Sequence, residues 1–171
     1  MLILFADETN MQPSRSAKFF IYGGLIIDVN QMDELHRGIE RIRAAHGYGS
    51  TDKLKFSTRE RPESVSIQEA TQAKKDVITL CTELGCKFLA YMILHNIIRF
   101  QSQDTNIKYA VNSILWAFER HLVEKDEVGI VLVDNLPVRS QWSYLSEKFS
   151  SGIDTPDGPR RLDRVRLLGA T

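Results

Sequence analysis

The first 28 residues, MLILFADETNMQPSRSAKFFIYGGLIID, contain two apolar runs that predict the first two strands of a sheet. Leu2–Ala6 is a continuous apolar run of strand length, and Lys18–Asp28 is a second run rich in aromatic and β-branched residues. The segment between them is too short for a crossover helix, so the two strands are expected to form an antiparallel hairpin. Gly23 and Gly24 predict a bulge or a close approach of two backbones.

The rest of the chain alternates between helical patterns and short apolar runs. Four stretches carry apolar residues at intervals of three and four, and they begin near residues 32, 66, 104 and 137. Ser66 and Glu69 form a capping-box pattern at the start of the second helix. The strand-like segments between the helices are residues 54–57, 87–94, 128–133 and 162–168. This order predicts an α/β domain with a mixed sheet and flanking helices.

The composition is that of an ordinary globular protein of 171 residues, a length that fits one domain. The 22 Lys and Arg balance the 22 Asp and Glu, which excludes a strongly basic coat for nucleic acid but leaves a local basic patch open. Cys81 and Cys86 lack a CxxC spacing and predict reduced, buried thiols. The apolar runs are shorter than the ~20 residues of a membrane span, and the N-terminus lacks a basic signal-peptide region. We therefore expect a cytoplasmic protein with no membrane partner.

Two carboxylates directly follow apolar strands: Asp7 after Leu-Ile-Leu-Phe-Ala and Asp134 after Gly-Ile-Val-Leu-Val. Ligands of open α/β sheets bind beyond the carboxyl ends of the strands, so parallel neighbours would bring these two side chains together. Such a pair needs a proton or a cation, and hard oxygen ligands suit Mg²⁺ or Mn²⁺. Helix capping is the alternative role. Glu8 is a third candidate ligand only if the strand has ended, because alternation turns it to the opposite face.

Two basic groups stand out in this balanced chain. The first consists of Lys53, Lys55, Arg59 and Arg61. The second, near the last expected strand, consists of Arg160, Arg161, Arg164 and Arg166. Lys55 lies in the strand-like run LKFS, where it could face a phosphate near the strand tips. For both groups a solvated surface is the alternative to a nucleic-acid contact.

The histidines and the common motifs add little. His46 and His121 lie at or beside apolar helical stripes and are expected to be structural, whereas His95 at a strand end is a candidate ligand. The sequence contains no G-x-S-x-G, P-loop, G-x-G-x-x-G or H-E-x-x-H motif. Serine hydrolases, P-loop NTPases, dinucleotide enzymes and zincins are therefore excluded as first hypotheses.

The order of four short motifs resembles that of domain-of-unknown-function family 3800. The motifs are FADET at residues 5–9, GG at 23–24, LKFS at 54–57 and VD at 133–134. The family usually begins with Asp-Glu-Ser, where this chain has Asp7-Glu8-Thr9 and keeps a hydroxyl. The resemblance covers essentially the whole chain. It implies a ribonuclease H-like fold and membership of a group of suspected nucleases found in bacteria and phages.

Transferred residue by residue, the resemblance implies a metal-dependent hydrolase of nucleic acid. Asp7 would be the first metal carboxylate, Glu8 its neighbour and Asp134 the second-strand carboxylate, with Mg²⁺ or Mn²⁺ as cofactor. Lys55 would match the family's lysine. The family's late Gln-x-x-Asp helix has no counterpart before Thr171. We therefore expect one ribonuclease H-like domain over residues 1–171 that lacks its C-terminal helix, and an exposed apolar sheet surface would then favour a homodimer.

The sequence leaves enzymatic activity open, and two alternatives remain. The first is a catalytically degenerate binding or regulatory module, for instance in a phage-defence or mobile-element system, which the near-neutral charge favours slightly. The second is a phosphoryl-transfer domain of the receiver type. A receiver domain requires a helix directly after the first strand, where this chain has the second strand.

Overall fold

The structure is a computed structural model that describes residues 1–9, 14, 18–55, 57–98, 102–133, 139–155 and 157–167. The chain divides into two compact units. The first, which we call the sheet unit, comprises Met1–Ile26 and Phe88–Thr171. The second, the helical unit, comprises Ile27–Lys87. The expectation of a single ribonuclease H-like domain stays a prediction.

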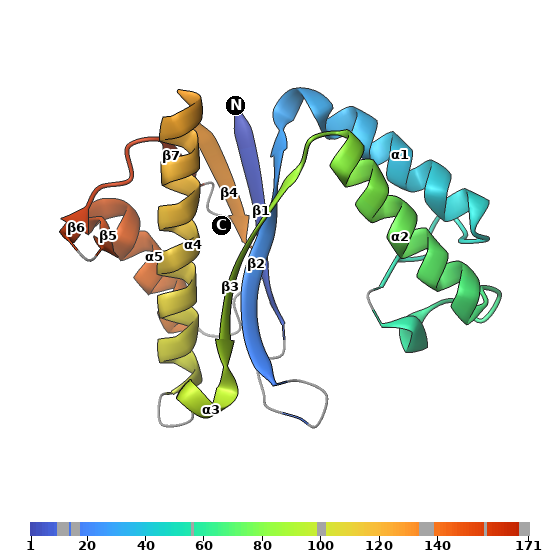
Figure 1. Cartoon of the computed structure of the whole chain (residues 1–171), viewed down its shortest axis with the longest axis horizontal. Helices are drawn as coiled ribbons and strands as arrows, with labels where there is room; N and C mark the ends of the chain where they lie inside the picture. Colours follow the sequence, from blue (N-terminus) through green and yellow to red (C-terminus); the bar gives the residue numbers. More distant parts are fainter. Residues whose placement is uncertain are drawn as a thin grey trace. The chain divides into compact units, whose positions relative to one another are not determined.

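The sheet unit is built on a five-stranded sheet with the order β3-β2-β1-β4-β7. The strands are β1 (Leu2–Thr9), β2 (Phe19–Asp28), β3 (Lys87–Leu94), β4 (Gly129–Val133) and β7 (Val165–Leu167). β1 pairs in parallel with β4, and β4 with β7. β2 runs opposite to its neighbours β1 and β3 (Figure 1). The α/β class, the mixed sheet and the antiparallel N-terminal hairpin are thus confirmed.

The two glycines of β2 lie where backbones approach closely. A Cβ at Gly23 would be 2.7 Å from the carbonyl oxygen of Leu89, and a Cβ at Gly24 would collide with the carbonyl oxygen of Phe5. The close approach predicted for this pair is therefore confirmed. Since β1 and β2 are antiparallel neighbours, the receiver-type alternative, which needs a helix between them, is excluded.

Helix α4 (Gln103–Lys125) covers one face of this sheet. Its N-cap residue is Ser102, whose hydroxyl accepts a hydrogen bond from the N–H of Thr105 at 3.1 Å. The helical stripe predicted from the sequence is buried, and its members are Ile107, Val111, Ile114, Phe118 and Leu122. The sheet residues of the same core include Leu4, Ala6, Phe20, Tyr22 and Val131. Burial of this stripe is what holds the helix on the sheet.

The remaining elements of the sheet unit are shorter. They are α3 (His95–Ile98), α5 (Arg139–Ser151), β5 (Ile153–Thr155) and β6 (Gly158–Arg160). The sequence did not predict α3 or the antiparallel β5–β6 pair. The helix expected from residue 137 is α5, and residues 137 and 138 lie outside the described residues. The expected last strand is the shorter β7, and its place at the sheet edge is confirmed.

The helical unit consists mainly of α1 (Met32–Ala45) and α2 (Ile67–Glu83), with single 3-10 turns at Val29–Gln31 and Thr58–Glu60. Both long helices agree with the predicted periodicity. The strand expected at residues 54–57 is wrong: residues 54, 55 and 57 are not in a strand, and residue 56 lies outside the described residues. Leu54 packs instead against a small core with Tyr48 and Val65. A short apolar run does not by itself distinguish a strand from a segment that packs against helices.

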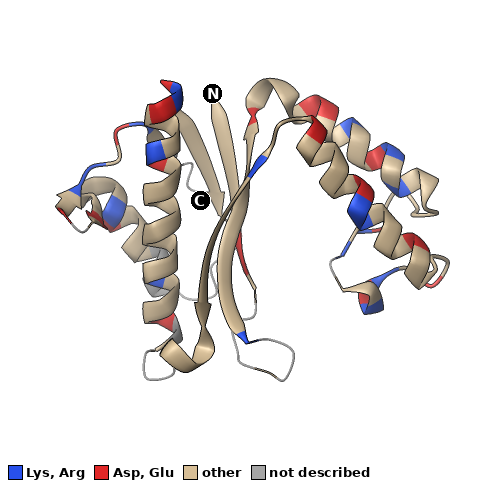
Figure 2. Cartoon of the chain, in the orientation of Figure 1, with Lys and Arg blue, Asp and Glu red and all other residues tan. Residues whose placement is uncertain are grey.

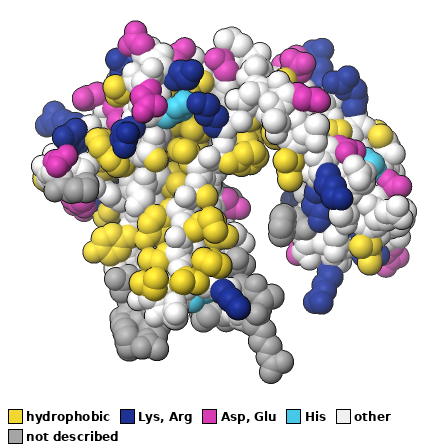
Figure 3. Space-filling view, in the orientation of Figure 1, with side chains coloured by type: hydrophobic (Ala, Val, Ile, Leu, Met, Phe, Trp, Pro, Cys, Tyr) yellow, Lys and Arg dark blue, Asp and Glu magenta, His cyan; other side chains and the backbone are white. Residues whose placement is uncertain are grey.

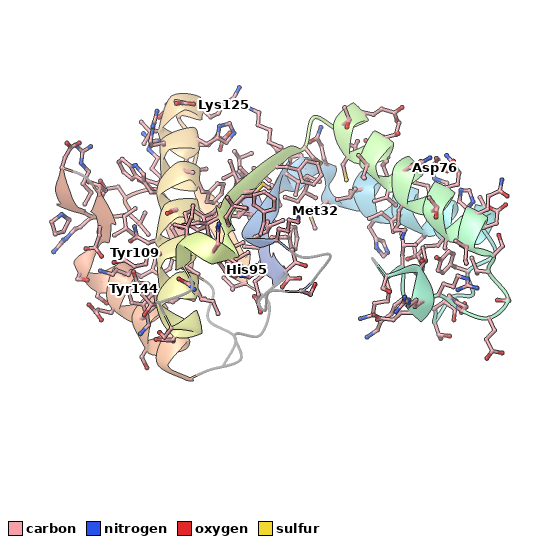
Figure 4. All side chains as sticks on the ribbon, turned by 60° about the horizontal axis from the view of Figure 1, so that its bottom comes forward. Met32, Asp76, His95, Tyr109, Lys125 and Tyr144 are labelled. Carbon is pink, nitrogen blue, oxygen red and sulfur yellow. The ribbon has the colours of Figure 1, made fainter. Side chains whose placement is uncertain are left out.

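His46, at the C-terminal end of α1, links the two helices. Its Nδ1 lies 2.5 Å from the carboxylate of Glu69 and its Nε2 lies 2.7 Å from that of Asp76, both on α2; Figure 4 shows Asp76 on that helix. The predicted structural role of His46 is confirmed. The capping box is only half formed, because Ser66 accepts from the N–H of Glu69 while the Glu69 carboxylate turns to His46.

We expect this histidine contact to make stability depend on pH. The hydrogen bonds from Glu69 and then Asp76 raise the pKa of His46 above its ordinary 6.5. Because the pKa is higher in the folded protein, the stabilisation is fully present below 6.5 and is lost as the pH rises through the folded pKa. Urea unfolding should therefore show lower stability at about pH 9 than at about pH 6.

The variant His46→Gln should lose this pH dependence. His36→Gln, at an exposed position of α1, is the matched control and should keep it. An equal fall in stability between the two pH values in wild type and His46→Gln would contradict the prediction.

Candidate functional site

Asp7 lies inside β1 and not after it, because β1 continues to Thr9. The expectation that the first strand ends at Asp7 is therefore wrong. Strand pairing depends on backbone hydrogen bonds, so it can continue past the apolar run wherever the side chains stay in solvent. Asp7 and Thr9 are exposed, as this explanation requires. Figure 2 shows the red of Asp and Glu near the end of β1 and few other charged residues on the strands of this sheet.

Alternation along β1 assigns its two acidic residues to opposite faces of the sheet. Leu4 and Ala6 are buried in the core with α4, so Glu8 belongs to the α4 side and Asp7 to the other. The N–H of Glu8 donates to the Asp7 carboxylate at 2.8 Å. The condition under which Glu8 could join Asp7 as a ligand, an earlier end of the strand, is not met.

The pairing of β1 with β4 bears directly on Asp134. The register runs in parallel from Leu2 opposite Gly129 to Ala6 opposite Val133. Asp7 directly follows Ala6 in the sequence, and Asp134 directly follows Val133. Asp134 lies outside the described residues, so the structure tests neither its place beside Asp7 nor its alternative role as a helix cap.

A hollow of about 600 Å³ in the sheet unit borders Asp7. Its walls include Phe5, Phe88 and Leu132, and Gly23 and Ala90 add little side-chain volume. Among the described residues that line the hollow, Asp7 is the one with a charged side chain. Apolar side chains are also gathered over β3 and α4 in the view of Figure 3. Asp7 thus stands at the border between solvent and an apolar recess.

Tyr22 is a buried polar residue that the sequence analysis did not single out. It is 1% exposed, and its hydroxyl has no hydrogen-bond partner among the described residues. Burial raises the pKa of Tyr22 far above the ordinary value, and the negative charges of Glu8 and then Asp7 raise it further. The phenol therefore stays protonated close to both carboxylates. An aromatic residue in a β-rich run carries no sequence signal for such a position.

His95, labelled in Figure 4, is the first residue of α3. Its backbone N–H donates to the carbonyl oxygen of Lys18 at 3.0 Å, and its Nε2 is buried without a partner in the described part of the chain. Within that part, no group of three or more His, Cys, Asp and Glu residues could hold a metal ion. A site with three such ligands in the sheet unit would have to include a residue outside the described part of the chain, and Asp134 is the candidate that the sequence supplies.

The first basic group lies in the helical unit and is not uniform. Lys53, Lys55 and Arg59 are exposed. Arg61 serves the local fold, because its Nε donates to the carbonyl oxygen of Val65 at 2.7 Å and its guanidinium also donates to that of Thr58 at 2.8 Å. Asp7 belongs to the sheet unit, so a role of Lys55 near Asp7 stays a prediction.

The second basic group is spread over several elements. Arg160 belongs to β6, and its guanidinium lies 5.5 Å from the ring centre of Trp116. Arg164 pairs with Asp126 at 2.9 Å. Arg161 is exposed, and the side chain of Arg166 lies outside the described residues. Arg160 and Arg164 thus have separate local partners, and a nucleic-acid contact of this group stays a prediction.

Comparison with known proteins does not assign the chain to a family. No family model matches the chain, and a search of curated proteins finds no match. The resemblance to domain-of-unknown-function family 3800 therefore stays a prediction. None of the described helices combines the length and the hydropathy needed to cross a bilayer.

Proposed function

We propose that this protein is a metal-dependent nuclease of the ribonuclease H-like superfamily, with its site on the sheet unit. The observation that carries the proposal is the parallel register of β1 and β4, whose last described partners are Ala6 and Val133. Asp7 and Asp134 are bonded directly to these partners. We infer that the two carboxylates meet at this edge and share one ion.

The strand order supports the ribonuclease H-like part of the proposal. Three antiparallel strands from the start of the sheet, β1 to β3, are joined to β4 and β7, which run parallel to β1. This combination is the arrangement that the resemblance leads one to expect. A fold alone does not specify a reaction, so the nuclease part rests on the carboxylates and on the resemblance.

The donors fit a hard divalent cation. Carboxylate oxygens are the ligands that Mg²⁺ and Mn²⁺ prefer, and Asp7 is exposed, so a phosphate can approach the same ion. When bound, such an ion supplies an activated water and stabilises the leaving oxygen of a phosphodiester. Asp7 and Asp134 would hold the ion, and the apolar recess beside Asp7 would border the approach of the substrate.

Cleavage assays with Mn²⁺ test this proposal on single- and double-stranded DNA and RNA. We expect cleavage of at least one of the four substrates and its loss when EDTA removes the ion. Binding of nucleic acid without cleavage, and without stabilisation by Mn²⁺, would contradict the proposal and indicate the catalytically degenerate binding module instead.

The exposed basic residues of the helical unit provide a prediction about nucleic-acid binding. In the double variant Lys55→Ala/Arg59→Ala we expect weaker binding and a shallower salt dependence. The slope of log K against log salt is negative, and each lost phosphate contact reduces its magnitude by about 0.9. The magnitude of the slope should therefore decrease by about 2 in the double variant. Fluorescence anisotropy with labelled oligonucleotides between about 50 and 200 mM salt measures both quantities.

The control variant is Arg37→Ala/Arg41→Ala, which removes the same charge from exposed positions of α1. It should leave the slope nearly unchanged. If the two double variants behave alike, Lys55 and Arg59 are part of a solvated surface.

A further inference from the structure

The end of α2 brings the two cysteines of the chain together. Both are free; Cys81 lies in the last turn of α2 and Cys86 comes just before β3. The N–H of Cys86 donates to the carbonyl oxygen of Cys81 at 2.9 Å, and that of Gly85 donates to Thr82 at 3.0 Å. With Gly85 at a φ of +68°, these bonds form a Schellman motif. This motif places the residue after the glycine against the residue five positions before it.

The backbone hydrogen bond limits the distance between the two cysteines. With standard bond lengths, it holds the Cα atoms of Cys81 and Cys86 within about 7 Å of each other, the range that a disulfide can bridge. In this motif the residues at these two positions often make an apolar side-chain contact, and here both positions are cysteines.

We propose that Cys81 and Cys86 form a reversible oxidation site, at which a small-molecule disulfide converts the two thiols into an intramolecular disulfide bond. The site does not depend on the proposed nuclease activity. Its ligand class is a low-molecular-weight disulfide such as oxidised glutathione. Closure would link the last turn of α2 to the residue that leads into β3.

Burial assigns the two cysteines different roles. Cys86 is half-buried and Cys81 is 4% exposed, so Cys86 meets the reagent first. The Cys86 thiolate attacks one sulfur of the reagent, which breaks the reagent's S–S bond, releases one thiol and leaves a mixed disulfide. Cys81 then loses its proton and attacks the Cys86 sulfur, which forms the internal bond and releases the second thiol. The protein loses two hydrogens, and the reagent is reduced to two thiols.

The surroundings predict a slow exchange at neutral pH. Burial raises the pKa of both thiols. Since the thiolate is the attacking species, few molecules are reactive at any moment. The attack of Cys81 on the mixed disulfide needs no diffusion, so the mixed disulfide should not accumulate in the wild type.

Intact-mass analysis of the full chain after treatment with oxidised glutathione tests the proposal. The wild type should lose two hydrogens without retaining glutathione, and peptide mapping should find Cys81 linked to Cys86. Cys81→Ser should accumulate a glutathione adduct on Cys86. Cys86→Ser should react at least roughly tenfold more slowly, because its remaining thiol is buried. Dithiothreitol should reverse every product.

Other results would overturn the proposal. Wild-type protein that keeps glutathione on either cysteine, or that forms a disulfide between two chains, lacks the internal bridge. Equal reaction rates of the two serine variants would contradict the assigned roles. Because peptide mapping uses wild-type protein alone, the main result does not depend on the folding of a variant. Slower amide exchange at residues 82–86 after oxidation would be an independent sign of closure.

Discussion

Asp7→Asn should reduce Mn²⁺-dependent cleavage of nucleic acid by at least about 100-fold while the protein stays folded. The substitution removes one of the two carboxylates proposed to hold the ion, and an amide oxygen is a much weaker ligand. Asp7 is exposed, so the loss of its charge costs the fold little. The loss also relieves repulsion from Asp134 if the two carboxylates are neighbours, so the metal-free protein should be as stable as the wild type or more stable.

Three measurements on the same preparations check this prediction: the cleavage rate, the affinity for Mn²⁺ and the urea unfolding midpoint. Asp134→Asn should behave like Asp7→Asn. Asp33→Asn, at an exposed position of α1, is the control and should match the wild type. Glu8→Gln should have a smaller effect than Asp7→Asn, because Glu8 belongs to the opposite face of β1. Full cleavage by Asp7→Asn would exclude the proposed site.

The largest effect on stability is expected at Glu119. This residue of α4 is 4% exposed. Its carboxylate accepts hydrogen bonds from the N–H groups of Asp163, Arg164 and Val165, at 3.0 to 3.2 Å. Glu119→Ala would leave these donors without their acceptor at the start of β7. Each unpaired buried group costs about 1–3 kcal/mol, so the free energy of unfolding should fall by about 2–4 kcal/mol.

Glu124→Ala provides the matched control on the same helix. The Glu124 side chain is 64% exposed, and its distance to Arg120 is 3.9 Å, so its removal should change the free energy of unfolding by less than about 1 kcal/mol. Glu119→Gln should lie between the two, because its amide keeps one oxygen acceptor but also brings a donor towards N–H groups. Similar losses in Glu119→Ala and Glu124→Ala would show that β7 is held by other contacts.

Local periodicity predicted the long elements well. The stripe from Ile107 to Leu122 identified α4 because each of its members lies within one or two turns of the next, and burial follows directly from that spacing. The hairpin of β1 and β2 could be predicted equally well, since the short sequence between the two apolar runs leaves no room for a helix.

The ends of the elements and the short strands were harder to predict from the sequence. β1 continues through Asp7 and Glu8 as a strand of the sheet, and no local apolar signal marks that continuation. The three-residue strands β5 and β6 have no periodicity to detect. The run at residues 54–57 resembles a strand by composition, and its described residues adopt none because Leu54 packs into the helical unit.

The α/β class, the hairpin, the long helices and the positions of Asp7 and Asp134 relative to apolar runs could all be read from the sequence. The pairing of distant polar groups could not, and it became visible only in the folded chain. Glu119 accepts from Val165, 46 residues later, and Glu69 turns from its own helix start to His46, 23 residues away. The reason is physical: periodicity reports which face of an element is buried, whereas a polar contact requires two atoms at hydrogen-bond distance, and chain folding alone brings such distant atoms together.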